Sequence, residues 1–261
     1  MNRYYLNFLL KRDLKYYKVP VPVILGVLVF GQLCTISAKV HEAWQQIRVI
    51  VYDDPIKKIG HWEADPSRTA ASLSELLNES GMMTSAVIAL VLLLMLTVPC
   101  FLADVKDGKN IVTQMRLPVS RLHYAGVRLL VPAAVTGIFL LTELLVSLAA
   151  WGIYLAVIPA ECLPAVHTPW GAEICRIFLP FADPARIPTA LSAVLLFPTA
   201  VFLTVLAVRG RDILCIPAGI VSVGGCVLFF APGVFSSVSV PVITVIAVFC
   251  SGWTVCHRKT F

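Results

Sequence analysis

The sequence predicts an all-α integral membrane protein with six transmembrane helices. Three observations lead to this fold class: the composition is strongly apolar, the charges gather between long uncharged segments, and those segments are long enough to cross a bilayer. Apolar residues make up 58% of the 261 residues and charged residues only 14%, whereas a soluble domain carries about 25% charged residues. The mean hydropathy is +0.85. A span needs about 20 mostly apolar residues to cross about 30 Å of hydrocarbon.

Residues 1–18 precede the first uncharged segment and have a helical period of their own. Arg3, Asn7, Lys11, Lys15 and Lys18 recur at four- and three-residue spacing, so they share one helix face. We expect an amphipathic helix here. Its role is open between a helix that lies in the inner membrane interface, with its cations toward lipid phosphates, and a basic anchor that only sets the orientation.

Segments without charges, or with Glu143 alone, define six spans within a transmembrane domain of residues 19–261. The C-terminal run from Ile213 to Cys256 has no charge and is long enough for two crossings at about 1.5 Å rise per residue. Ala231-Pro232-Gly233 divides this run, because Pro-Gly is a strong turn signal. The predicted spans are 19–38, 82–103, 129–157, 187–208, 213–230 and 235–256. Gly219, Gly224 and Gly225 in the fifth span favour close packing against neighbouring helices.

The distribution of Lys and Arg predicts the orientation. With both termini inside, fourteen of the 21 basic residues lie on the inner side and seven on the outer side. We therefore expect a multi-pass protein of the cell membrane with both termini in the cytoplasm. We also expect a bacterial source. The basic residues sit beside membrane segments, so the net charge of +6 predicts membrane lipids as a partner and no nucleic acid.

Two outer loops follow from this orientation, residues 39–81 and 158–186. In the first, the helical period of Val40, Trp44 and Ile47 predicts that the first transmembrane helix extends past the membrane. A second, short helix is expected from Pro66 to Leu77, because proline suits a first helical position.

The spacing of the cysteines does not define a set of disulfide bonds. The second outer loop holds Cys162 and Cys175, and both a disulfide between them and two free thiols stay open from the spacing. The other six cysteines lie within predicted spans, where a thiol behaves as a small apolar side chain. No CxxC motif or Cys/His cluster occurs, so no metal site is expected.

The loop of residues 104–128, between the second and third spans, carries the most informative pattern. The residue before a proline avoids the helical region, so Pro118 ends a short helix that begins after Gly108. Ser120 can then cap the next helix. Two interpretations of this loop stay open: it is either a docking element for a partner or an ordinary basic loop. The residues that form the pattern are Asp104, Lys106, Asp107, Gly108, Leu117, Pro118, Ser120 and Arg121.

This ordered pattern resembles the coupling loop of permease subunits in the type-2 ABC exporter family. The motif covers about thirty residues, while the N-terminal helix and the six spans resemble the family in architecture. The resemblance implies a permease that forms the substrate pathway as a dimer, with a second copy or a homologous permease. It also implies coupling through a short helix in this loop to separate ABC ATPase subunits. Arg128 stands where the family usually has a lysine near the third span, and it keeps the charge.

The chain has no nucleotide-binding motif of its own, since GxxxxGK[ST] is absent. ATP and Mg are therefore expected in the partner ATPase, and no cofactor on this chain. A membrane-embedded hydrolase would need acid/base groups or metal ligands gathered within the spans, but all five histidines fall in loops or at the chain end. We expect no enzymatic activity. The remaining alternative is a six-span sensory or structural subunit without transport activity.

Glu143 is the only carboxylate deep in a predicted span. A carboxyl at membrane depth costs a few kcal/mol if it is charged and unpaired. Two roles follow for it. Glu143 either lines the substrate pathway or the interface between two permeases, or it makes a hydrogen bond between helices of one chain.

Overall fold

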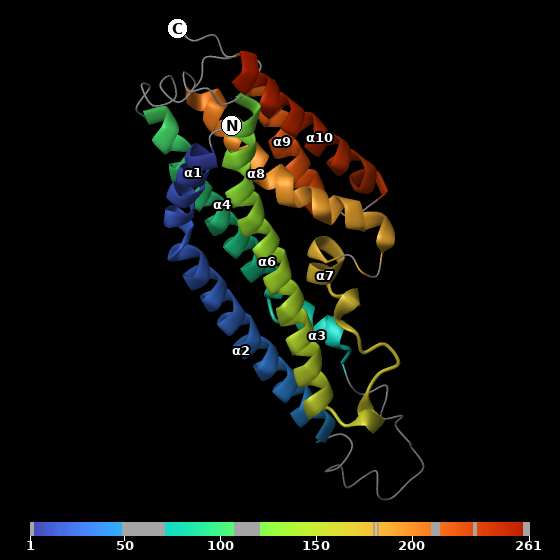
Figure 1. The fold of residues 1–261 in the computed structure, drawn as a ribbon. Helices are drawn as coiled ribbons and strands as arrows, with labels where there is room; N and C mark the ends of the chain where they lie inside the picture. The colour runs from blue at the N-terminus through green and yellow to red at the C-terminus, as the bar shows by residue number, and fades with distance from the viewer. Residues whose placement is uncertain are drawn as a thin grey trace, which may run out of the picture. The chain divides into compact units, whose positions relative to one another are not determined.

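A computed structural model describes residues 3–48, 71–106, 121–179, 181, 183–209, 215–231 and 234–257. Across these residues the regular structure is helical, without a strand (Figure 1). The all-α class predicted from the sequence is therefore confirmed.

The described residues contain the following α-helices, in chain order. They are α1 (Arg3–Tyr17), α2 (Pro20–Arg48), α3 (Leu73–Glu79), α4 (Met82–Lys106), α6 (Arg121–Val157), α7 (Glu173–Phe178), α8 (Ile187–Arg209), α9 (Cys215–Phe230) and α10 (Val234–His257). Short 3₁₀ helices occur at η3 (Ala160–Cys162), η4 (Pro169–Gly171) and η5 (Pro184–Arg186).

Five helical stretches of the described residues are long and apolar enough to cross a membrane. They are Leu10–Arg48, Met82–Leu102, Gly126–Val157, Pro184–Val208 and Ser236–Thr254. α9 is also apolar, but its 16 residues extend only about 24 Å, less than the roughly 30 Å of a hydrocarbon core. The chain is thus consistent with a multi-pass membrane protein, and a sixth crossing by α9 stays a prediction.

The ends of two helices differ from the predicted spans. α2 continues to Arg48, as the helical period after residue 38 predicts. α6 begins at Arg121, directly after Ser120, which the sequence predicts as the cap of this helix. The helix therefore starts before the predicted span of residues 129–157 and continues through Arg128, whose side chain is buried against a partner described below.

The short helix of the first outer loop begins later than predicted. The sequence places its start at Pro66, which lies outside the described residues, whereas α3 begins at Leu73. The reason is a capping box: the backbone N–H of Glu75 donates to Ser72 Oγ at 3.3 Å, and the backbone N–H of Ser72 donates to Glu75 Oε2 at 2.9 Å. These two bonds satisfy N–H groups at the helix start.

The chain divides into two compact units, and the divisions fall inside α2, α4, α6 and η5. Unit 1 comprises residues 1–24, 89–139 and 185–261, and unit 2 comprises residues 25–88 and 140–184. In unit 2, α3 and α7 pack with η4. Tyr154 Oη of α6 donates to the carbonyl of Ala71 at 3.0 Å, which holds the start of this small assembly.

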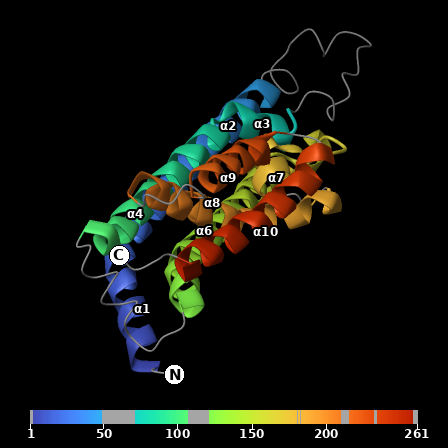
Figure 2. The same ribbon diagram turned by 90° about the horizontal axis from the view of Figure 1, so that it is seen from above.

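In unit 1, α8, α9 and α10 pack side by side (Figure 1 and Figure 2). Gly219 of α9 faces the backbone of α8, where a Cβ would lie 3.8 Å from Leu203. Gly225 faces Ile243 of α10, and a Cβ there would come within 2.7 Å of its Cγ2. Gly224 has nothing within 4 Å of that position. Close packing at Gly219 and Gly225 is confirmed, whereas the prediction for Gly224 is wrong because this position faces outward.

A hydrophobic cluster connects these helices to the rest of unit 1. Phe101 of α4 and Phe202 of α8 meet edge to face, with ring centroids 5.1 Å apart. Leu129 of α6 and Cys215 of α9 belong to the same cluster. Such a core fixes the ends of α4 and α6 that flank the predicted coupling loop.

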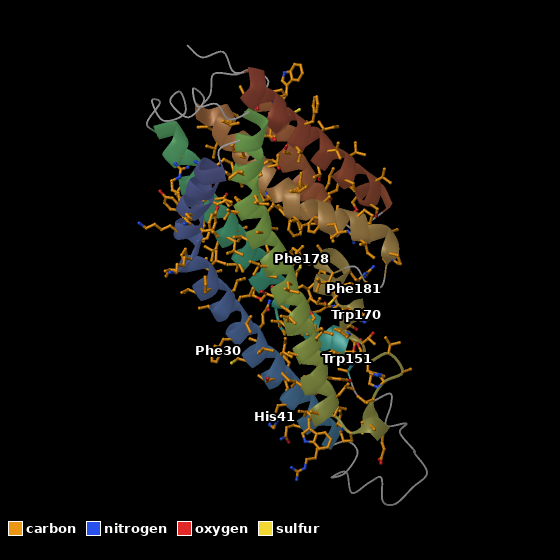
Figure 3. The ribbon with its side chains drawn as sticks, in the orientation of Figure 1. Phe30, His41, Trp151, Trp170, Phe178 and Phe181 are labelled. Atoms are coloured by element: carbon orange, nitrogen blue, oxygen red, sulfur yellow. The ribbon has the colours of Figure 1, made fainter. Side chains whose placement is uncertain are left out.

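Large apolar side chains also cover the outward faces of the long helices. Phe30 of α2 is 73% exposed and points away from the other helices (Figure 3). Val245 of α10 is 70% exposed and Met95 of α4 is 63% exposed. An outward apolar surface on several helices suits contact with lipid chains, because hydrocarbon replaces water there.

Candidate functional site

Three of the predicted coupling residues lie at helix ends. Asp104 and Lys106 are in the last turn of α4, and Arg121 is the first residue of α6. The other five, which are Asp107, Gly108, Leu117, Pro118 and Ser120, lie outside the described residues. The short helix expected after Gly108 therefore stays a prediction.

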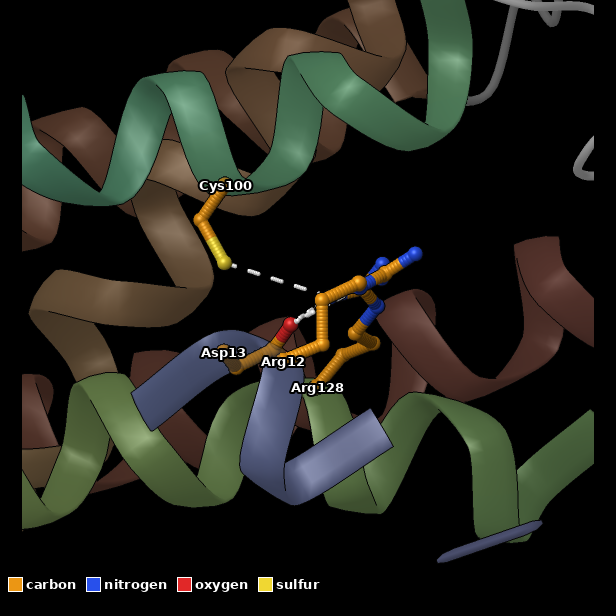
Figure 4. A network of polar contacts seen from close by, with 4 residues as sticks. All are labelled: Arg12, Asp13, Cys100 and Arg128. Atoms are coloured by element: carbon orange, nitrogen blue, oxygen red, sulfur yellow. Dashed lines mark hydrogen bonds and ion pairs between the residues drawn. The ribbon is translucent and has the colours of Figure 1, made fainter. Parts of the chain in front are cut away.

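A buried ion pair joins α1 to α6 in unit 1. Asp13 of α1 is 0% exposed and Arg128 of α6 is 1% exposed. Arg128 Nη1 donates to Asp13 Oδ1 at 2.5 Å (Figure 4). Removing one partner of a buried pair leaves an uncompensated charge, which costs several kcal/mol. The two side chains thus hold α1 against the start of α6.

Two further groups border this pair. Arg12 Nε lies 3.5 Å from the same Oδ1 of Asp13, and Arg128 Nη1 makes a long contact of 3.9 Å with Cys100 Sγ of α4. Tyr17, one turn after Asp13, is only 3% exposed. Polar contacts from three helices, α1, α4 and α6, therefore meet at one place (Figure 4).

The ion pair corrects the environment expected for Arg128. The sequence places Arg128 on the basic side of the coupling loop, but its charge is buried and neutralised by Asp13. Sequence reasoning missed Asp13 altogether. The sequence feature that could have pointed to Asp13 is its isolation: it is the only acid among residues 1–41 and lies within a strongly basic segment.

Glu143 belongs to a second buried cluster, in unit 2. Its side chain is 0% exposed, and Gln32 Nε2 of α2 lies 3.3 Å from both of its carboxylate oxygens. The same amide nitrogen is 3.1 Å from Ser85 Oγ and 3.4 Å from the carbonyl of Met82 in α4. Because an amide NH₂ has two hydrogens, Gln32 divides them among four acceptors.

This cluster shows one of the two roles left open for Glu143, the hydrogen bond between helices of one chain. Its place in a substrate pathway or a permease interface stays a prediction. Sequence reasoning missed Gln32. It could have been found because it is the one residue with a side-chain amide in the predicted span 19–38. The buried face of α6 continues one turn on at Ser147, where Cys175 Sγ donates to Ser147 Oγ at 3.6 Å.

Cys162 and Cys175 are both buried, and both are free thiols in this structure. The disulfide that the spacing left open is therefore not formed here. Burial raises the pKa of the Cys175 thiol to about 11, while the hydrogen bond with Ser147 acts in the opposite direction. Cys175 thus has little thiolate character at neutral pH.

Among the described residues, no group of three or more His, Cys, Asp or Glu has the arrangement of a metal site. No family model, curated protein or solved structure matches this chain. The features of this chain that bear on function are therefore the loop pattern in the sequence and the two buried polar clusters, which connect helices to one another.

Proposed function

We propose that this chain is the transmembrane permease subunit of an ATP-driven exporter in the cell membrane. It has six spans and cytoplasmic termini, and works as a permease dimer with separate ABC ATPase subunits. The observation that carries the proposal is the buried Asp13–Arg128 pair. This pair fixes the N-terminal helix to α6 just beyond the loop whose residues resemble the coupling loop of type-2 ABC exporters.

The pair gives the proposed coupling a physical route. α6 starts at Arg121, directly after the loop, and Arg128 lies about two turns or 10 Å further along the helix. A displacement of the loop by the ATPase would move the start of α6. Because the buried ion pair resists separation, α1 would move with it, and the movement would continue along the same helix into the span.

The proposal is tested by purifying the tagged full chain from its native membrane in mild detergent, with mass spectrometry and an ATPase assay. We expect a soluble ABC ATPase to co-purify with the chain. Replacing Pro118 and Arg121 by alanine should abolish co-purification. The matched control is Arg258→Ala with Lys259→Ala, which removes cytoplasmic charge away from the loop and should leave the partner bound.

A chain that purifies without an ATPase under several detergents would overturn the proposal and favour a sensory or structural subunit. A partner retained equally by the loop variant and the control would place the ATPase contact elsewhere.

The role of Glu143 in the pathway needs its own variant. Glu143→Gln keeps the size of the side chain and one acceptor oxygen for Gln32, but it replaces the other oxygen by an NH₂ donor and cannot carry a charge. If Glu143 lines the pathway, this variant should lower transport while assembly and expression stay normal. Unchanged transport, assembly and expression would restrict Glu143 to its hydrogen bond with Gln32.

A further inference from the structure

A groove in unit 1 runs between α1, the start of α2 and α6. Its volume is about 760 Å³, within the roughly 300–1,000 Å³ typical of small-molecule sites. Lys11 and Lys15 of α1 and Lys18 in the turn after it line the groove on one side, and residues from Leu130 to Ile138 of α6 line it on the other. It is therefore formed by the N-terminal helix and the same part of α6 that the ion pair connects.

The walls of the groove are apolar. Leu14 is 53% exposed, Leu130 56% and Ile138 48%. Val131 and Val135 lie deeper, at 4% and 5% exposure. This surface suits a hydrocarbon chain, which gains from contact with apolar walls along its length.

The charged side chains among the described residues that line the groove are all basic. Lys11, Lys15 and Lys18 are all exposed, and none of the described residues that line the groove is acidic. Among the described residues, no carboxylate forms an ion pair with any of the three. Their four- and three-residue spacing places the three lysines along one face of α1 and the turn that follows it. An anionic group with a long apolar tail complements both sides of the groove.

We propose that this groove binds one anionic phospholipid. Lys11, Lys15 and Lys18 hold its phosphate, and one acyl chain lies against Leu14, Leu130 and Ile138. A second groove in unit 1 offers a comparison within the same protein. It lies between α9 and α10 and has a volume of about 430 Å³. The described residues that line it are apolar or carry a hydroxyl or thiol group, and none of them is charged. These residues therefore offer no group that selects an anionic lipid.

The test is native mass spectrometry of the full chain with phosphatidylglycerol and phosphatidylcholine of identical acyl chains. We expect one tightly retained phosphatidylglycerol and no comparable phosphatidylcholine. Each lysine replaced by glutamine should weaken retention about fivefold, so Lys11→Gln, Lys15→Gln and Lys18→Gln together should weaken it on the order of a hundredfold. Lys39→Gln is the control, because Lys39 is outside the groove and pairs with Glu42 at 3.0 Å. Equal retention of the two lipids, or unchanged retention by the triple variant, would overturn the proposal.

A second variant separates a lipid seated in the groove from general attraction to basic residues. Ala134→Phe fills the apolar side of the groove and keeps all three lysines. We expect it to lower phosphatidylglycerol retention about tenfold, whereas Ala38→Phe, an exposed position of α2 outside the groove, should have no effect. Full retention by Ala134→Phe would show that the lipid is not in the groove. Inorganic phosphate at equal concentration should not displace the lipid, and displacement by it would show a site for free anions instead.

Discussion

At the scale of single residues, the structure depends most on the polar side chains that it buries. Asp13, Arg128, Gln32 and Glu143 are each at most 2% exposed. A bilayer core offers no water to such groups, so each needs a partner within the protein. The partners come from helices that are distant in the sequence, and each pair therefore fixes one helix against another.

The ion pair gives a prediction on stability. Arg128→Met should lower the free energy of unfolding by about 3–5 kcal/mol, because it leaves the carboxylate of Asp13 buried beside Arg12 alone. Thermal unfolding of the purified chain in detergent measures the loss. The double variant Asp13→Leu with Arg128→Met should regain most of it, since no buried charge is then left unpaired.

Arg12→Gln is the control for this prediction. The side chain of Arg12 is 24% exposed and lies at 3.5 Å from Asp13, so its removal should cost no more than about 1 kcal/mol. A single Arg128 variant as stable as the parent chain would contradict the structural role of the pair.

Cys175 gives a prediction on pH dependence. Burial raises its thiol pKa from 9.0 to about 11, and the thiolate is the reactive form. A raised pKa means less thiolate at every pH below it, so at pH 8 ionisation alone lowers the reactive fraction roughly a hundredfold. Alkylation of a variant with Cys175 as its only cysteine should be slow at pH 8 and accelerate as the pH approaches 11, as measured by intact-protein mass spectrometry.

The control is Val166→Cys as the only cysteine, because Val166 belongs to the same predicted outer loop and is 65% exposed. It should react quickly at pH 8. Equal rates for the two cysteines at this pH would mean that Cys175 is not buried in the native protein.

At the scale of helices, the fit of α9 against α10 depends on a single glycine. Gly225→Ala should destabilise the chain by about 1–3 kcal/mol, because the new methyl group would lie 2.7 Å from Ile243 Cγ2 and the branched side chain cannot easily move away. Gly224→Ala, one residue earlier, meets nothing within 4 Å and should be neutral or stabilising by up to about 1 kcal/mol.

Thermal unfolding of both variants in the same detergent tests this difference. Replacing Ile243 by leucine removes the Cγ2 methyl group and should partly rescue Gly225→Ala. Equal stability of the Gly224 and Gly225 variants would contradict the packing of α9 on α10.

Helix ends show where local sequence reasoning succeeds. The extension of α2 beyond the first span follows from apolar residues at helical spacing, which is a local property. The start of α3 also has a local cause, the Ser72–Glu75 capping box, but Pro66 offered a competing start signal in the same segment. The start of α6 at Arg121 agrees with the predicted cap at Ser120, which is also a local signal. The burial of Arg128 further along α6 has no local cause, because it depends on Asp13 in another helix.

At the scale of the whole molecule, the number of crossings determines where the termini lie. If α9 crosses the membrane in addition to the five longer helices, the number is even and both termini face the cytoplasm, as the distribution of Lys and Arg predicts. Fluorescent and alkaline phosphatase reporters fused to each end of the full chain should then both report the cytoplasmic side. Termini on opposite sides would mean five crossings, with α9 remaining on one side.

The sequence by itself determined the all-α class and the approximate positions of the long helices, because apolar length and the placement of charges can be read along one stretch of chain. It also singled out Glu143, since a carboxylate within an apolar segment stands out without any neighbour. Only the tertiary structure decided that Glu143 meets Gln32, that Arg128 meets Asp13, and that three lysines line an apolar groove. These features depend on which faces of distant helices come together, and helical periodicity defines the faces of each helix without saying which of them meet.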